Sequence, residues 1–383
     1  MMSTAPARPS RADLLFDARH IRQSGIGTYL ATELHHLEEV FAERALSLAV
    51  LVDPDKVPTL RPTTAVVTPQ PIGASMYSLH EQQVWDRALK SVRPRAIWLP
   101  TYPFPLAWLR RRNRKTALFV TVHDLLHLQD HEITGQSWAH RRYARIMLGL
   151  DARFCSTVFT PSQATASSLL AATPSARVCV TPIPLDDGWF APPPEHPAPV
   201  HGPFILYVGN TKWHKNLTLL LGAYTDVSGS IPHKLVIAGG GESVRTIDER
   251  VAALAEQLGD RVVITGRVDF ETLRSLYADA DLLVQPSLYE GVGLPPLEAM
   301  ASHTAVLASD IAAQRETCGD GAEYFDPYDR KALSHLIQKY CQDEAARGEL
   351  QQRGWARVTT RQSQIASRTA AELVSAKLGG RPS

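Results

Sequence analysis

At 383 residues the chain is longer than the size at which a single hydrophobic core keeps growing, so two domains are expected. Hydrophobic residues make up 44% of the sequence, charged residues 21%, and the net charge is +1. These values exclude a disordered chain and a strong nucleic-acid binder. The four cysteines are far apart and form no CxxC pair, which argues against a zinc site and favours a reduced, cytoplasmic compartment. No run approaches the roughly 18 apolar residues that span a bilayer, so a soluble protein is expected.

The first half of the chain alternates short apolar runs with longer amphipathic ones. Such runs, bounded by turn or polar residues, are typical of strands buried on both faces of a parallel sheet. The predicted strands are ADLLFDA (12 to 18), LSLAVLV (46 to 52), AIWLP (96 to 100), ALFVTVHD (117 to 124), TVFTPS (157 to 162) and VCVTPIP (178 to 184).

A proline-dense segment, 186 to 203, interrupts this alternation and is predicted to be an interdomain linker. The alternation then restarts with six further predicted strands: FILYVGN (204 to 210), KLVIAGG (234 to 240), RVVITGRV (261 to 268), ADLLVQPS (280 to 287), TAVLAS (304 to 309) and EYFDP (323 to 327). Helical patterns separate them, including NLTLLLGAYTDV, TIDERVAALAEQLG and FETLRSLYADA.

Two successive βα series predict an α/β protein with two facing, doubly wound, Rossmann-like domains. The predicted boundaries are 1–185 for the first domain, 186–203 for the linker, 204–355 for the second domain and 356–383 for a C-terminal helical segment. Ligands of such sheets bind beyond the carboxyl ends of the strands, so the strand-to-helix loops should carry the chemistry.

The loop after FILYV reads GNTKWHKNLTLLL and contains the first candidate site. Lys215 comes just before an apolar helix, where the helix dipole and the unpaired N–H groups attract anions. A phosphate site is one interpretation, and a solvated lysine in a surface turn is the other.

The second candidate is YEGVGLPPLEAM, Tyr289 to Met300. Gly291 and Gly293 give the backbone freedom for a close approach, and PLEAMA begins a helix with proline in its first turn. The N–H groups at this helix start are expected to bind a diphosphate, while Glu298 accepts hydrogen bonds from a ribose and Glu290 from a sugar. The alternative is a helix entry in which Glu298 only complements the dipole, and the paired acids make that alternative the weaker one.

EGVGLPPLEAMA closely resembles the EGFGLPxLEAMA signature of retaining glycosyltransferase family 4, in which two glutamates are spaced E-x7-E. YVGN..HKNL, LVIAGGGE, ITGRV....L..LY..AD.LV.PS and GDGAEYFDPYD follow the family in order, so that the likeness covers most of 204 to 327. The resemblance implies a GT-B fold with an interdomain cleft. It implies that 1–185 binds the acceptor, that 204–355 binds the nucleotide sugar, and that a helix in 356–383 crosses back to the first domain. It also implies that the donor-binding residues of the second domain are Gly209, Asn210, Lys212, Lys215, Gly239, Arg267, Val268, Glu290, Gly291, Val292, Gly293, Leu294 and Glu298.

Weaker matches lie in the first half of the chain. FDARHIRQSGIGTYL places Gly25 and Gly27 like the family's glycine loop beside the donor diphosphate, although a plain tight turn also explains a lone GxG. TVHDLLHL places His123 where the family's histidine meets the transferred sugar, and Asp124 beside the acceptor. FTPSQATASSLL places Ser162 near the acceptor cleft.

Several positions depart from the family pattern. Asn210 stands where many relatives carry an arginine, so that either Lys212 substitutes for it or Lys215 acts with backbone amides alone. Gln362 and Gln364 replace the two aromatic residues of the family's FSW before the last helix, which puts the packing of that helix in question.

The run WLRRRNRK, 108 to 115, carries five cations in eight residues. A solvated basic face is one interpretation. The other is a contact with an anionic membrane or with a pyrophosphate-linked acceptor.

The resemblance therefore predicts a retaining hexosyltransferase that uses no cofactor and no metal, with His123, Glu290 and Lys215 as its catalytic residues. The donor is expected to be GDP-mannose, and the acceptor a glycan or polyprenyl-diphosphate-linked oligosaccharide of O-antigen or exopolysaccharide synthesis at the cytoplasmic membrane's inner face. A rhamnosyltransferase using GDP- or dTDP-rhamnose is the first alternative.

A GT-B nucleotide-sugar epimerase and a non-catalytic nucleotide-sugar-binding protein are further alternatives. A Rossmann dehydrogenase is disfavoured because SGIGTY lacks the third glycine of GxGxxG and does not directly follow a strand.

Overall fold

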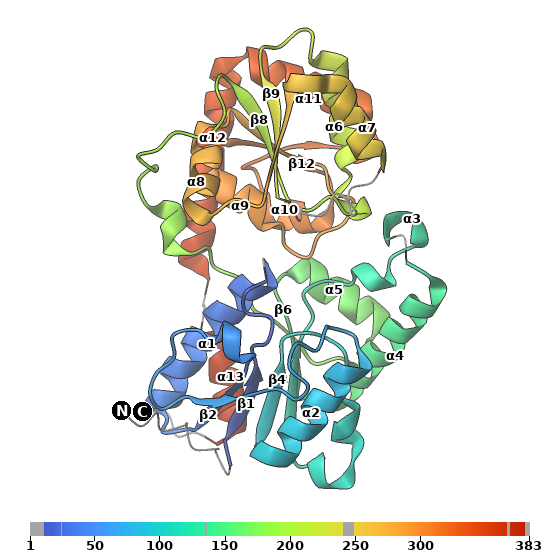
Figure 1. Cartoon of the computed structure of the whole chain (residues 1–383), viewed down its shortest axis with the longest axis vertical. Helices are drawn as coiled ribbons and strands as arrows, with labels where there is room; N and C mark the ends of the chain where they lie inside the picture. Colours follow the sequence, from blue (N-terminus) through green and yellow to red (C-terminus); the bar gives the residue numbers. More distant parts are fainter. Residues whose placement is uncertain (1–10, 24, 135, 240–248, 366–367, 380–383) are drawn as a thin grey trace. The chain divides into compact units, whose positions relative to one another are not determined.

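The computed structural model describes residues 11–379 except 24, 135, 240–248 and 366–367 (Figure 1). The chain forms two compact units. The first unit comprises Met1–Leu128, Trp138–Ile183 and Ala366–Ser383, and the second comprises Gln129–Ser137 and Pro184–Ile365. Each contains one sheet in which every paired strand is parallel, as the recurring apolar runs predict.

The first unit has a seven-stranded sheet in the order β3-β2-β1-β4-β5-β6-β7. Its strands are β1 Leu14–Asp17, β2 Leu48–Leu51, β3 Ala65–Val67, β4 Ala96–Leu99, β5 Ala117–Thr121, β6 Thr157–Thr160 and β7 Val178–Val180. Its helices are α1 Ile26–Glu43, α2 Leu79–Val92, α4 Trp138–Phe154, α5 Gln163–Ala172 and α13 Thr369–Lys377. Six strands lie where the apolar runs predict them. The edge strand β3 was not predicted, because its three residues are only half-buried.

The second unit has a six-stranded sheet in the order β10-β9-β8-β11-β12-β13. Its strands are β8 Phe204–Val208, β9 Lys234–Ala238, β10 Val262–Gly266, β11 Leu282–Gln285, β12 Ala305–Ser309 and β13 Glu323–Phe325. Its helices are α3 His131–Thr134, α6 Leu217–Val227, α7 Glu249–Leu258, α8 Phe270–Asp279, α9 Leu294–Ala301, α10 Ala312–Cys318, α11 Arg330–Gln342 and α12 Glu344–Gln364. The second and third glycines of AGGG and the residues before α7 lie outside the described part.

Both sheets reverse their strand order beside their first strand. The reversal lies between β1 and β4 in the first unit and between β8 and β11 in the second. Ligands of doubly wound sheets bind at this switch point, beyond the carboxyl ends of the two strands. The loops after β1, β4, β8 and β11 are therefore the places to look for a site.

The proline-dense segment 186 to 203, predicted as an interdomain linker, belongs to the second unit. Trp189 is 7% exposed and belongs to the core of the second unit. The Arg274 side chain on α8 donates to the carbonyl oxygens of Ala191 and Pro192, and Asp279 accepts from the Ala198 N–H. Proline prevents regular structure here, but the segment still packs along α8.

The C-terminal segment joins the first unit later than predicted. Helix α12 continues to Gln364 and packs against α9 and β12 of the second unit, so the segment that belongs to the first unit begins near residue 366 rather than at 356. Helix α13 then packs on α1 of the first unit. Gln362, which replaces an aromatic residue of the family pattern, forms two hydrogen bonds with the Leu185 backbone, at 3.0 and 2.9 Å. Two hydrogen bonds from the Gln362 side chain therefore hold the end of α12, where the family sequence pattern has aromatic residues.

The segment Gln129–Ser137 was predicted as part of the first domain but belongs to the second unit. Its helix α3 packs beside the 3-10 turn Trp213–Lys215. Such a contact is tertiary and leaves no local pattern in the sequence. Among the described helices, none combines the length and apolar character needed to cross a membrane.

Gly27, the second residue of α1, lies where a side chain has no room. A Cβ at this position would lie 2.4 Å from the carbonyl oxygen of Ile21. The Gly27 N–H donates to the Gln23 oxygen at 2.6 Å, so the loop after β1 folds directly onto the helix start. Gly25, the N-cap, has a φ of 69°, in the left-handed region that glycine adopts without strain. The two glycines therefore fix the path of this loop.

We expect Gly27→Ala to lower the free energy of unfolding of the protein by about 1–3 kcal/mol, because the methyl group overpacks against backbone. Gly149→Ala is the matched control, since Gly149 lies inside α4 with no atom within 4 Å of an added Cβ. That substitution should raise stability by about 0.5–1 kcal/mol. Urea unfolding of both variants measures the difference, and equal stabilities would contradict this account of the loop.

Candidate active site

The loops after β8 and β11 meet through an ion pair. Lys215 ends the 3-10 turn Trp213–Lys215, and its Nζ lies 2.7 and 2.9 Å from the two carboxylate oxygens of Glu290. The side chains are 15% and 10% exposed. Because β8 and β11 are the strands at which the order reverses, the pair lies at the switch point of the second sheet. Two residues singled out from the sequence thus lie in direct contact.

The Glu290 carboxylate has two further partners that the sequence did not indicate. The Nε2 of Gln285, the last residue of β11, and the Oγ of Ser287 both donate to Oε1 of Glu290, at 3.0 and 2.7 Å. Burial raises the pKa of Glu290, but the ammonium of Lys215 and these hydrogen bonds outweigh it and hold the pKa below its ordinary value. Glu290 is therefore an ionised, fixed hydrogen-bond acceptor at neutral pH.

Backbone bonds hold the two loops in register. The Leu288 N–H donates to the His214 carbonyl at 2.8 Å, one residue before Lys215. On the far side of Glu290, the Thr317 hydroxyl donates to the Val292 carbonyl at 2.7 Å. The carboxylate therefore lies on a loop that is held at both ends.

The loop after Glu290 leads into α9 through Gly293, whose φ is 86°. Pro295 and Pro296 follow in the first turn and carry no N–H. An anion at this helix end would therefore have to be bound by the amides of the loop from Gly291 to Leu294. The predicted diphosphate site is therefore limited to the N–H groups of the residues before the two prolines.

Glu298 forms a separate pair inside the second unit. Its Oε2 accepts a hydrogen bond of 2.7 Å from the hydroxyl of Tyr277, a fully buried residue of α8. Burial raises the pKa of Glu298 to about 7, and the tyrosine bond offsets only part of that effect. Glu298 therefore changes charge near neutral pH, whereas Glu290 does not.

Close backbone approach also shapes the loop after β8. Gly239 has a φ of 104°, and a Cβ there would lie 2.5 Å from the Gly209 carbonyl oxygen. The hydroxyl of Tyr207 donates to the Asn210 carbonyl at 2.6 Å, and the Asn210 side chain accepts from the Lys212 N–H at 3.1 Å. The Asn210 side chain thus caps its own loop.

Three further predicted donor residues lie in loops at the same edge of the sheet and form no hydrogen bond or ion pair with Glu290 within the described part of the chain. Lys212 is exposed in the loop after β8. Arg267 is exposed after the edge strand β10, and Val268 is partly buried against the core.

His123 follows β5 in the first unit. Its Nε2 lies 2.9 Å from the Pro100 carbonyl, and because a carbonyl can only accept, this nitrogen carries the proton. Burial lowers the pKa of His123, which keeps the ring neutral. The ring packs edge-to-face on Tyr29 of α1, with the centroids 4.9 Å apart. His123 thus has a fixed tautomer and orientation.

Ser162, a predicted acceptor residue, serves as the N-cap of α5. It is 2% exposed, and its Oγ accepts from the Thr165 N–H at 3.1 Å. The Thr165 hydroxyl in turn donates to the His123 carbonyl at 3.3 Å. Asp124 accepts the Leu126 N–H at 2.9 Å, in a turn that begins the loop after β5. The structure therefore gives Ser162 a helix-capping role close to His123.

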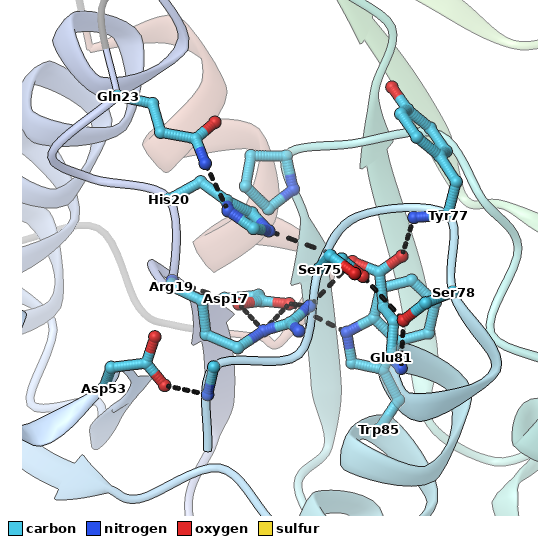
Figure 2. A network of polar contacts seen from close by, with 12 residues as sticks. Asp17, Arg19, His20, Gln23, Asp53, Ser75, Tyr77, Ser78, Glu81 and Trp85 are labelled. Atoms are coloured by element: carbon cyan, nitrogen blue, oxygen red, sulfur yellow. Dashed lines mark hydrogen bonds and ion pairs between the residues drawn. The ribbon is translucent and has the colours of Figure 1, made fainter. Parts of the chain in front are cut away.

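A buried ion cluster that sequence reasoning missed lies at the switch point of the first sheet (Figure 2). Asp17, the last residue of β1, accepts two bonds from the Arg19 Nε at 2.9 and 3.1 Å and one from the Trp85 indole at 2.7 Å. Arg19 also donates to Glu81 of α2 at 3.0 Å. The signal that could have found it is the charged D-x-R at the end of an apolar strand.

The basic run 108 to 115 is partly neutralised by one acid of α2. Arg110 and Arg112 both lie within ion-pair distance of Asp86, while Trp108 is 9% exposed. Contact with an anionic membrane stays a prediction.

Comparisons with known proteins show which sequences this chain is similar to. Residues 192–357 match the family "Glycosyl transferases group 1". The O-antigen chain mannosyltransferase RfbU of Salmonella typhimurium is 28% identical over 258 residues, which are 64% of this chain and 71% of that protein. The serotype-specific mannosyltransferase WbdA of Escherichia coli is 33% identical over 150 residues, which are 38% of this chain and 18% of that protein.

Solved structures share the whole fold. A sucrose-phosphate synthase from Thermosynechococcus elongatus superposes with a TM-score of 0.73 at 20% identity, covering 96% of this chain and 98% of that one. Anabaena HepE in complex with UDP and glucose gives a TM-score of 0.67 at 17% identity, covering 97% of this chain and 100% of that one. The expected GT-B fold is confirmed, and residues 192–357 are similar to the glycosyl transferases group 1 family.

Proposed function

We propose that this chain is a retaining, metal-independent mannosyltransferase of O-antigen assembly, which transfers mannose from GDP-mannose to a glycan or polyprenyl-diphosphate-linked acceptor. The observation that carries the proposal is the buried Lys215–Glu290 pair at the switch point, inside the segment that matches the family. The mannosyl group is supported by the relatives named as O-antigen mannosyltransferases.

The reaction needs stabilisation of two charges that develop together, one on the departing diphosphate and one on the sugar. The bond between the anomeric carbon and the phosphate oxygen breaks, and a bond to the acceptor hydroxyl forms on the same face. The leaving phosphate oxygen takes the hydroxyl proton, so no side-chain nucleophile is required. Lys215 and the amides from Gly291 to Leu294 would stabilise the diphosphate.

The ion pair suits Lys215 to this task. An ammonium has three donors, and the two contacts with the Glu290 carboxylate occupy at most two of them. The third can face a phosphate oxygen. Oε1 of Glu290 already accepts from Lys215, Gln285 and Ser287. Oε2 accepts from Lys215 alone among the described residues, so this oxygen keeps capacity for a sugar hydroxyl. The same pair can therefore hold a phosphate on one side and a sugar hydroxyl on the other.

In this proposal Glu298 accepts from the ribose diol, and neutral His123, which lies in the first unit, contacts a sugar hydroxyl. The Tyr277 hydroxyl occupies one acceptor position of Glu298 and aims the carboxyl group. Because burial raises its pKa to about 7, Glu298 changes charge close to neutral pH.

Lys215→Ala and Glu290→Ala should each reduce transfer by at least 10²–10³-fold, the scale seen when one electrostatic stabiliser is removed. Each substitution also leaves the other charge buried without its partner, which lowers the free energy of unfolding by about 3–5 kcal/mol. The double variant Lys215→Met with Glu290→Gln removes both charges, so it should regain stability without regaining transfer. Urea unfolding and a radiolabelled transfer assay measure the two effects.

The control for these variants is Arg315→Ala. Arg315 pairs with Asp310 on the surface, with side chains 51% and 49% exposed, so its loss should cost about 1 kcal/mol or less and leave transfer unchanged. Near wild-type turnover in the double variant would sink the assignment of Lys215 and Glu290.

Ribose recognition should depend on pH through Glu298. The wild type should bind GDP more tightly than 2′-deoxy-GDP, and the ratio should rise by up to about tenfold between pH 6 and 8, as the carboxylate forms. Glu298→Gln should show a small ratio that does not change with pH. Titration calorimetry at each pH gives the ratio, and comparing the two nucleotides cancels the titration of their phosphates. A pH-independent ratio in the wild type would refute the ribose role.

A thermal-shift screen of nucleotide diphosphates and their sugars tests the donor. GDP and GDP-mannose should raise Tm more than UDP, ADP or dTDP do, because only binding to the folded state stabilises it. A larger shift with dTDP-rhamnose or GDP-rhamnose would favour the rhamnosyltransferase. Conversion of the donor with no acceptor present would favour an epimerase, and no shift with any nucleotide would count against the proposal.

A further inference from the structure

The ion cluster of the first unit has a second function besides holding Asp17 and Arg19. Glu81 lies in the first turn of α2 and is 1% exposed. One of its oxygens accepts from Arg19, and the other accepts the backbone N–H of Tyr77 at 2.7 Å. Figure 2 shows Tyr77 at the end of this chain of contacts, with its ring directed away from the cluster. A buried charge network therefore fixes one residue of the loop before α2.

Tyr77 is held in an unfavourable backbone conformation. Its φ is 62°, in the left-handed region that costs a residue with a Cβ of the order of 1 kcal/mol or more. The side chain does not recover this cost by burial, since Tyr77 is 40% exposed. Strain of this kind at a non-glycine residue is concentrated at ligand sites, where the surrounding structure enforces it.

Two other rings meet Tyr77 at the same place. The centroid of Tyr102 lies 5.4 Å from that of Tyr77, the centroid of His127 lies 5.2 Å from it, and the two partners are 5.7 Å apart. Tyr102 is 6% exposed and His127 is half-buried. The accessible surface of this group, the Tyr77 cluster, therefore comes from Tyr77 and His127.

The Tyr77 cluster lies where the first sheet is expected to bind a ligand. Tyr102 follows β4 and His127 follows β5, which are neighbouring parallel strands, and β4 borders the switch point. Pro100, two residues before Tyr102, accepts the hydrogen bond from His123. Burial raises the pKa of the Tyr102 hydroxyl, and the nearby Tyr77 and the carboxyl group of Asp124 raise it further. The rings are thus accompanied by hydrogen-bonding groups.

We propose that the Tyr77 cluster is the stacking subsite for a pyranose ring of the acceptor glycan, with the ring of Tyr77 as its platform. One face of a pyranose carries C–H groups with partial positive charge, and these are attracted to the negative face of an aromatic ring. The hydroxyls at the rim of the sugar then meet Asp124 and the tyrosine hydroxyls. This inference rests on the proposed glycosyl transfer and adds the acceptor side of the same reaction.

Saturation-transfer NMR tests this subsite without the donor. Selective irradiation of the aromatic protons of the full-length protein should transfer saturation to the ring C–H protons of octyl α-D-mannopyranoside or octyl N-acetyl-β-D-glucosaminide. Tyr77→Leu should reduce that transfer at least fivefold, and Tyr77→Phe should keep it. Leu and Phe are both unbranched at Cβ, so they meet the same left-handed backbone with similar strain.

Tyr328→Leu is the control for non-specific binding, because Tyr328 is 72% exposed in the second unit and has no aromatic contact among the described residues. Its saturation transfer should equal that of the wild type. No transfer in the wild type, or equal transfer in Tyr77→Leu, would overturn the inference.

A parallel Tm shift with GDP separates this inference from the proposed function. A GDP shift without pyranoside binding would refute the subsite alone. Pyranoside binding that depends on Tyr77, without any nucleotide shift, would support the subsite and refute the donor proposal alone.

Discussion

The ion pair between Lys215 and Glu290 is the interaction on which the candidate site depends. Two charges that are about nine-tenths removed from water are costly, and a hydrophobic pair of the same size is often at least as stable. The pair is tolerated because Gln285 and Ser287 add hydrogen bonds to the carboxylate. The pair lies beyond two neighbouring strands, where doubly wound sheets bind ligands, and the proposed binding of a donor gives a reason other than stability for its presence.

The first unit also has buried ion pairs at the switch point of its sheet, formed by different residues. Asp17 and Arg19 follow β1, the strand at its switch point, and Glu81 completes the cluster from α2. The strain at Tyr77 depends on this cluster, because Glu81 holds its backbone N–H. In both units buried charge lies at the carboxyl edge of a parallel sheet, where the backbone leaves room for loops rather than for core. The two halves of a GT-B fold thus each offer one ordered, polar edge.

Most of the fold could be predicted from the sequence because strands buried on both faces are continuous apolar runs. The features that were not predicted depend on tertiary contacts. The strand β3 is a half-buried edge of three residues, and the segment Gln129–Ser137 joins the second unit through contacts that no local pattern encodes. The proline-dense segment was mistaken for a linker because proline content shows only what the backbone cannot form. Trp189 was the residue in it that indicated packing.

The sequence predicted the main residues of the candidate site but not the contacts that hold them. The spacing of two glutamates and a lysine before an apolar helix identified Glu290, Glu298 and Lys215 as candidates, but not their partners. The Tyr277 bond to Glu298 needs α8 and α9 side by side. The Glu81 contacts need α2 beside β1, which follows from strand order rather than from sequence spacing.

The most direct test of the central claim is NMR analysis of the product formed from GDP-α-D-mannose and the octyl glycosides. Retention during transfer from an α-linked donor predicts an α-mannoside, identified by the one-bond carbon–hydrogen coupling at its anomeric carbon. No product should form with the double variant Lys215→Met and Glu290→Gln. A β-mannoside would contradict the retaining mechanism, and product formation by the double variant would contradict the role of the buried ion pair.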